Sequence, residues 1–235
     1  MRIFGASIPK SGTHFLTGIF REMGFSTLAC RKVVDGNRRR MVLPEAALGA
    51  GAGDVYAYGH WRAKRESARQ LADAGYAVLV LIRDPRDICL SMADFLKAGL
   101  PADVHKRVPE LRHQPLREII AGCIRGYRLD AFKQPGIRET CEGWLDWRRH
   151  GAVVLRYEDA SAAVAERRTL PDLAGLGLDP DRFLAASVRC YRAASSSTMN
   201  KGVSFRWRSE FDDDLRDLWR REAAGVAAAL GYEEV

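Results

Sequence analysis

The chain has 235 residues, 47% of them hydrophobic, and a formal net charge of +7 at pH 7. This composition excludes a disordered chain and a membrane-spanning protein. The length favours one well-buried domain, residues 1–235, over two. The positive charge fits anionic partners such as phosphates, sulfates or nucleic acid, and it fits a merely arginine-rich composition equally well.

The N-terminal stretch is apolar but is broken by Gly5 and Pro9. It therefore lacks the long apolar core of a secretory signal peptide, and we expect a soluble, cytoplasmic protein without a membrane span. The cysteines are dispersed and odd in number, which argues against a disulfide framework or a zinc site and indicates mostly inert buried thiols. They are Cys30, Cys89, Cys123, Cys141 and Cys190.

Strand-like and helix-like segments alternate along the chain. Strand-like apolar runs occupy 2–7, 55–59, 77–82 and 152–157, with a weaker candidate at 26–31. Helix-period segments occupy 13–24, 63–74, 86–98, 115–132, 159–168, 180–193 and 213–230. This alternation predicts an α/β fold, a parallel β-sheet with helices on both faces, in which ligands bind where strands end and helices begin.

Three stretches, 100–115, 133–143 and 194–211, are predicted to be irregular because prolines, charges or serines interrupt any period. The cluster Arg38–Arg39–Arg40 favours a solvated loop over a nucleic-acid-binding arm, because no aromatic residues are interleaved with it. We therefore predict no nucleic-acid partner.

The turn after the first strand reads SIPKSGTHFL, residues 7–16. Backbone amides at a helix start, together with the helix dipole, favour an anion there. Lys10 adds a positive charge, Gly12 permits close approach of the backbone, and Ser11 and Thr13 supply hydroxyl donors. The stretch is therefore predicted to hold a phosphate-like group, against the alternative of an ordinary glycine turn.

A nucleotide triphosphatase would present G-x-x-x-x-G-K-[ST], and here lysine and glycine stand in exchanged order. The stretch PKSGTHFL instead resembles the 5′-phosphosulfate loop of sulfotransferases that use 3′-phosphoadenosine 5′-phosphosulfate (PAPS). The resemblance implies the sulfotransferase fold, which is similar to that of P-loop NTPases. It also implies that Lys10, Ser11, Gly12, Thr13 and His14 contact the donor.

A second stretch, VLIRDPRDICLSMADF at 80–95, resembles the 3′-phosphate segment of the same family. Arg83 ends the apolar run and Ser91 follows on the next helix, so the resemblance implies that they bind the 3′-phosphate. The alternative is that the charged residues here form ordinary surface ion pairs, which contribute little.

A third stretch, MNKGVSFRW at 199–207, partly resembles the family's Arg-Lys-Gly-x-x-Gly-x-Trp segment. Lys201, Gly202 and Trp207 match, and the first two are implied in 3′-phosphate binding. Asn200 stands where arginine is usual, and Phe205–Arg206 replaces the customary Gly-Asp.

His60, in YGHWR directly after the strand 55–59, falls where cytosolic members carry their catalytic base. The resemblance implies that His60 takes the proton of an acceptor hydroxyl and that Lys10 stabilises the leaving oxygen during in-line transfer. Alternatives for the base are a carboxylate or His14, and His60 could instead be a packing residue.

The adenine contacts are less defined. Phe15 stands where the family has a stacking tryptophan, although its spacing with Ile19 and Phe20 suits a core role as well. Tyr157, in the LRYEDA stretch, would approach the adenine, as would an unassigned hydroxyl of 195–198.

The function predicted from the sequence is thus PAPS-dependent transfer of a sulfuryl group to a small-molecule or glycan hydroxyl, without a metal. A small-molecule or nucleoside kinase that uses ATP and a non-catalytic polyanion binder are the alternatives. The sequence predicts neither the acceptor nor the oligomeric state.

Overall fold

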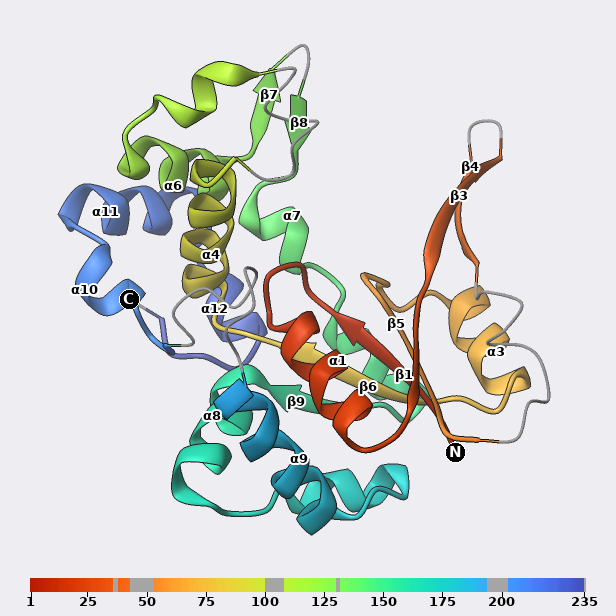
Figure 1. The fold of residues 1–235 in the computed structure, drawn as a ribbon. Helices are drawn as coiled ribbons and strands as arrows, with labels where there is room; N and C mark the ends of the chain where they lie inside the picture. Colours follow the sequence, from red (N-terminus) through yellow and green to blue (C-terminus); the bar gives the residue numbers. More distant parts are fainter. Residues whose placement is uncertain (36–37, 43–52, 100–107, 130–131, 194–202, 235) are drawn as a thin grey trace. The chain divides into compact units, whose positions relative to one another are not determined.

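The computed structural model describes residues 1–35, 38–42, 53–99, 108–129, 132–193 and 203–234 (Figure 1). The chain forms two compact units. Unit 1 comprises Met1–Ile82 and Gly143–Met199, and unit 2 comprises Arg83–Glu142 and Asn200–Val235. The single domain expected from the sequence stays a prediction.

Unit 1 is built on a parallel sheet of 5 strands in the order β2-β5-β1-β6-β9 (Figure 1). The strands are β1 (Arg2–Ser7), β2 (Ser26–Ala29), β5 (Val55–Gly59), β6 (Ala77–Ile82) and β9 (Val153–Arg156). All the predicted strands are present, and the sheet is flanked by helices as predicted. Because the strands are parallel, the loops that follow β1, β5 and β6 leave the sheet at the same edge.

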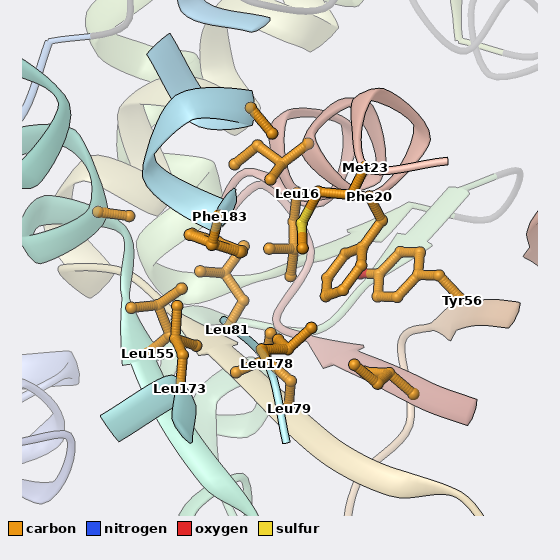
Figure 2. Packing of buried hydrophobic residues seen from close by; sticks show 14 of the residues in the cluster. Leu16, Phe20, Met23, Tyr56, Leu79, Leu81, Leu155, Leu173, Leu178 and Phe183 are labelled. Carbon is orange, nitrogen blue, oxygen red and sulfur yellow. The ribbon is translucent and has the colours of Figure 1, made fainter. Parts of the chain in front are cut away.

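One face of the sheet carries a cluster of buried hydrophobic residues (Figure 2). Helices α1 (Thr13–Glu22) and α9 (Pro180–Ala193) pack against each other. Their apolar side chains meet alternate strand residues, since successive strand side chains point to opposite faces. The labelled members of this cluster are Leu16, Phe20, Met23, Tyr56, Leu79, Leu81, Leu155, Leu173, Leu178 and Phe183.

The other face of the sheet is covered by an aromatic cluster. The ring of Phe4 lies 4.9 Å from that of Trp61 and 6.5 Å from that of Trp147, which belongs to the short helix η2 (Leu145–His150). The Trp147 indole N–H donates to the Trp61 carbonyl at 2.8 Å. This packing fixes the chain immediately after His60.

The remaining elements of unit 1 are α3 (Arg65–Asp73), α8 (Tyr157–Glu166), η3 (Pro171–Leu176) and an antiparallel pair, β3 (Arg31–Asp35) and β4 (Arg38–Val42). The loop predicted at Arg38–Arg40 is therefore wrong. These residues pair with β3, with Val33 opposite Arg40, because local pairing satisfies their backbone groups whatever their charge.

Unit 2 consists mainly of helices (Figure 1). Helix α4 packs against α6, and α6 against α11. The elements are α4 (Pro85–Lys97), η1 (Pro109–Arg112), α6 (Leu116–Arg125), β7 (Tyr127–Leu129), β8 (Phe132–Gln134), α7 (Ile137–Cys141), α10 (Trp207–Glu210), α11 (Asp213–Glu222) and α12 (Val226–Ala229).

The long helix predicted at 115–132 is wrong, because α6 ends at Arg125. Gly126 has φ 94, and a Cβ there would lie 2.7 Å from the Gly136 nitrogen. The close approach of two backbones at these glycines ends the helix and lets β7 and β8 pair. As a result the stretch predicted as irregular, 133–143, contains part of β8 and all of α7.

The helix predicted at 213–230 is two helices, α11 and α12. Gly225 precedes α12 with φ 78, a left-handed conformation that interrupts the helical hydrogen bonds and favours glycine.

Two further sequence expectations bear on the described residues. None of the described helices is both long and apolar enough to cross a membrane. The cysteines are unpaired thiols, and Cys89, Cys123 and Cys141 are buried.

Candidate functional site

The loop between β1 and α1 forms a tight turn at the edge of the unit 1 sheet. Lys10 has φ 70 and Gly12 has φ 103, so two of three consecutive residues lie in the left-handed region. This region is unfavourable for a side-chain-bearing residue such as lysine. The Ile8 amide donates to the Leu81 carbonyl at 3.2 Å and the Ser11 amide to the Ile8 carbonyl at 3.0 Å, which holds the turn against β6.

Ser11 fastens this turn through its side chain. It is 0% exposed, and its hydroxyl lies 2.6 Å from the Ile8 carbonyl and 3.1 Å from the Leu81 carbonyl. Both neighbours are acceptors, so the hydroxyl hydrogen points into the protein. The predicted donation from Ser11 to a ligand stays a prediction, whereas its structural role is visible.

The N-terminus of α1 suits an anion. Helix geometry leaves the first-turn amides without intrahelical acceptors, and the first turn contains no acidic residue. Thr13 and His14 are the first residues of this helix. Partial burial and the nearby Lys10 ammonium lower the pKa of His14 below its ordinary value, so the neutral ring is favoured there.

Gly12 is required by a close contact as well as by its φ. A Cβ at this position would lie 2.7 Å from Tyr157 Cδ2. Tyr157 is 5% exposed and its ring centroid lies 6.1 Å from that of Phe15, which is 4% exposed. Both rings thus belong to the core cluster, and their predicted adenine contacts stay predictions. The exposed ring next to Phe15 is Tyr191, 42% exposed, at 6.5 Å.

His60 follows β5 at the same edge of the sheet as the turn. Its Nδ1 lies 2.8 Å from the Ser7 carbonyl oxygen, at the end of β1. A carbonyl only accepts, so Nδ1 carries the hydrogen and Nε2 is the basic nitrogen of the neutral ring. His60 itself is exposed. The arrangement orients an accessible imidazole as a proton acceptor next to the loop that carries Lys10.

Ser7 was not singled out in the sequence, yet it links His60 to the start of α1. It is 1% exposed, and its hydroxyl lies 2.7 Å from Thr13 Oγ1 and 3.5 Å from His60 Nδ1. The signal that could have located it is its place as the last residue of β1, two positions before Pro9.

In unit 2, Arg83 is held at the start of the segment that leads into α4. It is 6% exposed, its Nη2 donates to the Val203 carbonyl at 3.0 Å, and it lies 3.5 Å from an Asp87 carboxylate oxygen. Ser91 is partly buried on α4. The predicted 3′-phosphate contacts of Arg83 and Ser91 stay predictions.

Asp87 clamps the segment that contains Phe205 and Trp207. Its carboxylate accepts from the Phe205 amide at 2.6 Å and from the Trp207 amide at 3.1 Å. Burial raises the pKa of Asp87, and the Arg83 guanidinium opposes that rise. A buried carboxylate that accepts hydrogen bonds from two amides and pairs with an arginine has a structural role.

Asp84 and Arg86 form a second buried pair under Trp207. Asp84 accepts from the Arg86 Nε at 2.8 Å, from its Nη2 at 2.7 Å and from the Trp207 indole at 3.1 Å. The Arg86 guanidinium lies 3.7 Å from the centre of the Trp207 ring. The charged run RDPRD is therefore a buried network and not a set of surface ion pairs. The sequence signal that could have indicated its burial is its position between an apolar strand and a helix.

Phe205 occupies the place of a glycine in the resembled family segment, and its φ is 58. The backbone thus keeps a left-handed conformation although the side chain is large. The other residues predicted near this segment, Lys201, Gly202, Asn200 and the hydroxyls of 195–198, lie outside the described residues.

Across the part of the chain that the structure describes, no group of three or more His, Cys, Asp or Glu side chains is arranged to hold a metal ion. The predicted independence from metals stays a prediction.

The fold of the chain resembles that of solved sulfotransferases. The mouse sulfotransferase SULT7A1 complexed with PAP has a TM-score of 0.60 at 15% identity, covering 97% of this chain and 86% of its own. Retinol dehydratase in complex with androsterone and the inactive cofactor PAP has a TM-score of 0.58 at 13% identity, covering 96% of this chain and 81% of its own.

The chain has the sulfotransferase fold. This confirms the fold expected from the three sequence stretches. No protein-family model matches the sequence, and no curated protein does so. At such low identity the likeness establishes the fold alone, and the activity has to be argued from the residues.

Proposed function

We propose that the protein is a sulfotransferase that moves a sulfuryl group from PAPS to a hydroxyl of a small molecule or glycan. The observation that carries the proposal is the edge of the unit 1 sheet. There a glycine turn and a helix N-terminus adjoin His60, whose Nδ1 is fixed at 2.8 Å from the Ser7 carbonyl. One loop supplies the anion site, and the neighbouring strand end supplies an oriented base.

The residues of the loop fit the 5′ end of such a donor. The left-handed backbone at Lys10 and Gly12 turns the chain into α1, whose first-turn amides and positive dipole end suit a phosphosulfate. Thr13 and His14 add side-chain donors or polar contacts at the same helix start. Lys10 brings the positive charge that a dianionic group requires.

The donor, when bound, supplies an activated sulfuryl group on a phosphate leaving group. The work left to the protein is then positioning and charge stabilisation, as in phosphoryl transfer. His60 Nε2 takes the proton of the acceptor hydroxyl, and Lys10 stabilises negative charge on the leaving oxygen. Neutral imidazole is the competent form of the base.

The residues that contact the 3′-phosphate and the adenine are assigned from the resemblance to the family segments. Arg83, Ser91, Lys201 and the Gly202 backbone hold the 3′-phosphate, and Phe15 and Tyr157 lie toward the adenine. A guanidinium and a hydroxyl suit a terminal phosphate dianion. This phosphate distinguishes the donor from ordinary adenine nucleotides.

Ligand preference tests the proposal directly. Thermal unfolding is measured with adenosine 3′,5′-bisphosphate (PAP), ATP with Mg²⁺, and AMP, because a ligand that binds the native state raises the midpoint by mass action. We expect the largest rise with PAP. A larger, Mg²⁺-dependent rise with ATP would indicate a kinase instead.

Transfer is then measured with ³⁵S-labelled PAPS and a panel of phenols, sugars and lipid alcohols. Label in the acceptor supports the function. Binding that ignores PAP, accepts any polyanion and collapses with added salt would indicate a non-catalytic polyanion binder.

A further inference from the structure

The hydroxyl of Ser7 has a definite orientation that follows from the tautomer of His60. Nδ1 of His60 donates to the Ser7 carbonyl at 2.8 Å, so this nitrogen carries a hydrogen and cannot accept one. The Ser7 hydroxyl, 3.5 Å from the same nitrogen, therefore has no acceptor in His60.

The remaining neighbour of the Ser7 hydroxyl is Thr13 Oγ1 at 2.7 Å. Ser7 is 1% exposed, and a buried hydroxyl hydrogen without an acceptor is costly. Ser7 accordingly donates and Thr13 accepts. Each hydroxyl has one hydrogen, so the hydrogen of Thr13 is left to donate elsewhere.

Thr13 is the first residue of α1, at the helix end where an anion is favoured. Among the described residues, its Oγ1 has no partner other than Ser7. Its hydrogen is thus available for a ligand at the helix start, because the tautomer of His60 leaves Thr13 as the acceptor of the Ser7 hydroxyl.

We infer that Ser7 is a positioning residue that sets both ends of the site. Its carbonyl selects the His60 tautomer with a basic Nε2, and its hydroxyl turns the Thr13 hydrogen toward the 5′ anion of the ligand. The inference deepens the proposed function and rests on it for the identity of that anion.

The test compares two ligands that differ only at the 5′ end. Affinities of wild type, Ser7→Ala and Ser7→Thr are measured by calorimetry for PAP and for adenosine 3′-monophosphate, which lacks the 5′-phosphate. We expect Ser7→Ala to weaken the binding of PAP about fivefold to tenfold, because one oriented hydrogen bond is lost. The affinity for adenosine 3′-monophosphate should not change. Ser7→Thr, which keeps the hydroxyl, should retain PAP affinity.

A double-mutant cycle checks that the effect passes through Thr13. Thr13→Val should weaken the binding of PAP, and adding Ser7→Ala to this variant should not lower the PAP affinity further. The matched control is Thr17→Val, one turn further along α1, where a buried hydroxyl donates to the Thr13 carbonyl at 2.8 Å. PAP affinity should not change in this control.

Equal weakening of both adenine ligands in Ser7→Ala, or additive effects in the cycle, would overturn the inference. Failure of the proposed function looks different, because the wild type would then prefer ATP to PAP. In that case the same variants are compared with ATP and adenosine, and an unchanged ATP affinity in Ser7→Ala overturns the role of Ser7.

Discussion

Gly12 lies against the ring of Tyr157, so closely that a Cβ at position 12 would stand 2.7 Å from Tyr157 Cδ2. Tyr157, the first residue of α8, and the turn between β1 and α1 therefore constrain each other's position within unit 1. A single methyl group at Gly12 would have to move either the ring or the loop.

Gly12→Ala is expected to destabilise the protein by about 3 kcal/mol, from a strained positive φ and from overpacking against Tyr157. Gly75→Ala is the matched control, because its φ is 71 and nothing lies within 4 Å of the added Cβ. That variant should lose only about 1 kcal/mol. Urea unfolding measures both, and equal losses would show that the Tyr157 contact has no energetic consequence.

His60→Ala should reduce the rate of sulfate transfer by about 10²- to 10⁴-fold, the contribution of a general base, while PAP binding persists. Single-turnover kinetics with labelled PAPS separates the two effects. His150→Ala, an exposed histidine on η2, is the control. Undiminished transfer in His60→Ala would move the base to another residue, with His14 as the first alternative.

Lys10→Ala should slow transfer by about 10²-fold or more, because charge on the leaving oxygen is no longer stabilised. The φ of 70 at this position allows a second comparison. Lys10→Gly should lose as much activity as Lys10→Ala but be the more stable variant by about 1 kcal/mol, since glycine adopts the left-handed backbone without strain. Wild-type transfer rates in either variant would refute the assignment.

Asp87→Ala is expected to destabilise the protein by about 3–5 kcal/mol, because Arg83 and the Phe205 and Trp207 amides lose a buried carboxylate. The matched control is Asp73→Ala. It removes an i,i+4 pair with Arg69 whose side chains are 83% and 70% exposed, against 7% and 0% for Arg83 and Asp87. That loss should stay below about 0.5 kcal/mol. Similar unfolding free energies for the two variants would contradict the buried clamp.

His14 predicts a pH dependence of stability. Burial and Lys10 lower the pKa of the folded state below the unfolded value near 6.5, so the unfolded chain binds more protons as the pH falls through that value. The folded state should therefore lose stability as the pH falls below 6.5 through this group, and the loss should be small because His14 is exposed to solvent.

The measurement is the unfolding free energy of wild type and His14→Gln between pH 5 and pH 8, and the difference between them should grow only on the acid side. His113→Gln, on the exposed turn after η1, serves as the control. Parallel curves of unfolding free energy against pH for wild type and His14→Gln would contradict the lowered pKa of His14.

Most strands of the sheet and the turn after β1 could be predicted from the sequence. The apolar runs at 2–7, 77–82 and 152–157 gave the strands β1, β6 and β9, because a buried parallel strand is apolar along its length. The glycine turn at Lys10–Gly12 was predicted from residue types that such a turn requires. Chain order alone then placed His60 at the edge of the sheet that carries this turn.

Two of the misread stretches depended on residues outside the stretch itself. The end of α6 at Arg125 follows from the approach of Gly136 to Gly126, and no period within 115–132 reveals it. The RDPRD run was ambiguous in the same way, since charges read as exposed until Trp207 is found over Arg86 and Asp84.

The sequence by itself determined the strands of the sheet, the glycine turn between β1 and α1 and the place of the candidate base, because these depend on local periodicity and on residue types with few conformational alternatives. Only the tertiary structure decided that Ser11 fastens the loop, that Ser7 joins His60 to Thr13, and that Asp87 holds Phe205 and Trp207. The bonds of His60 to Ser7 and of Asp87 to Phe205 and Trp207 join residues 53, 118 and 120 positions apart, and short-range patterns carry no record of them.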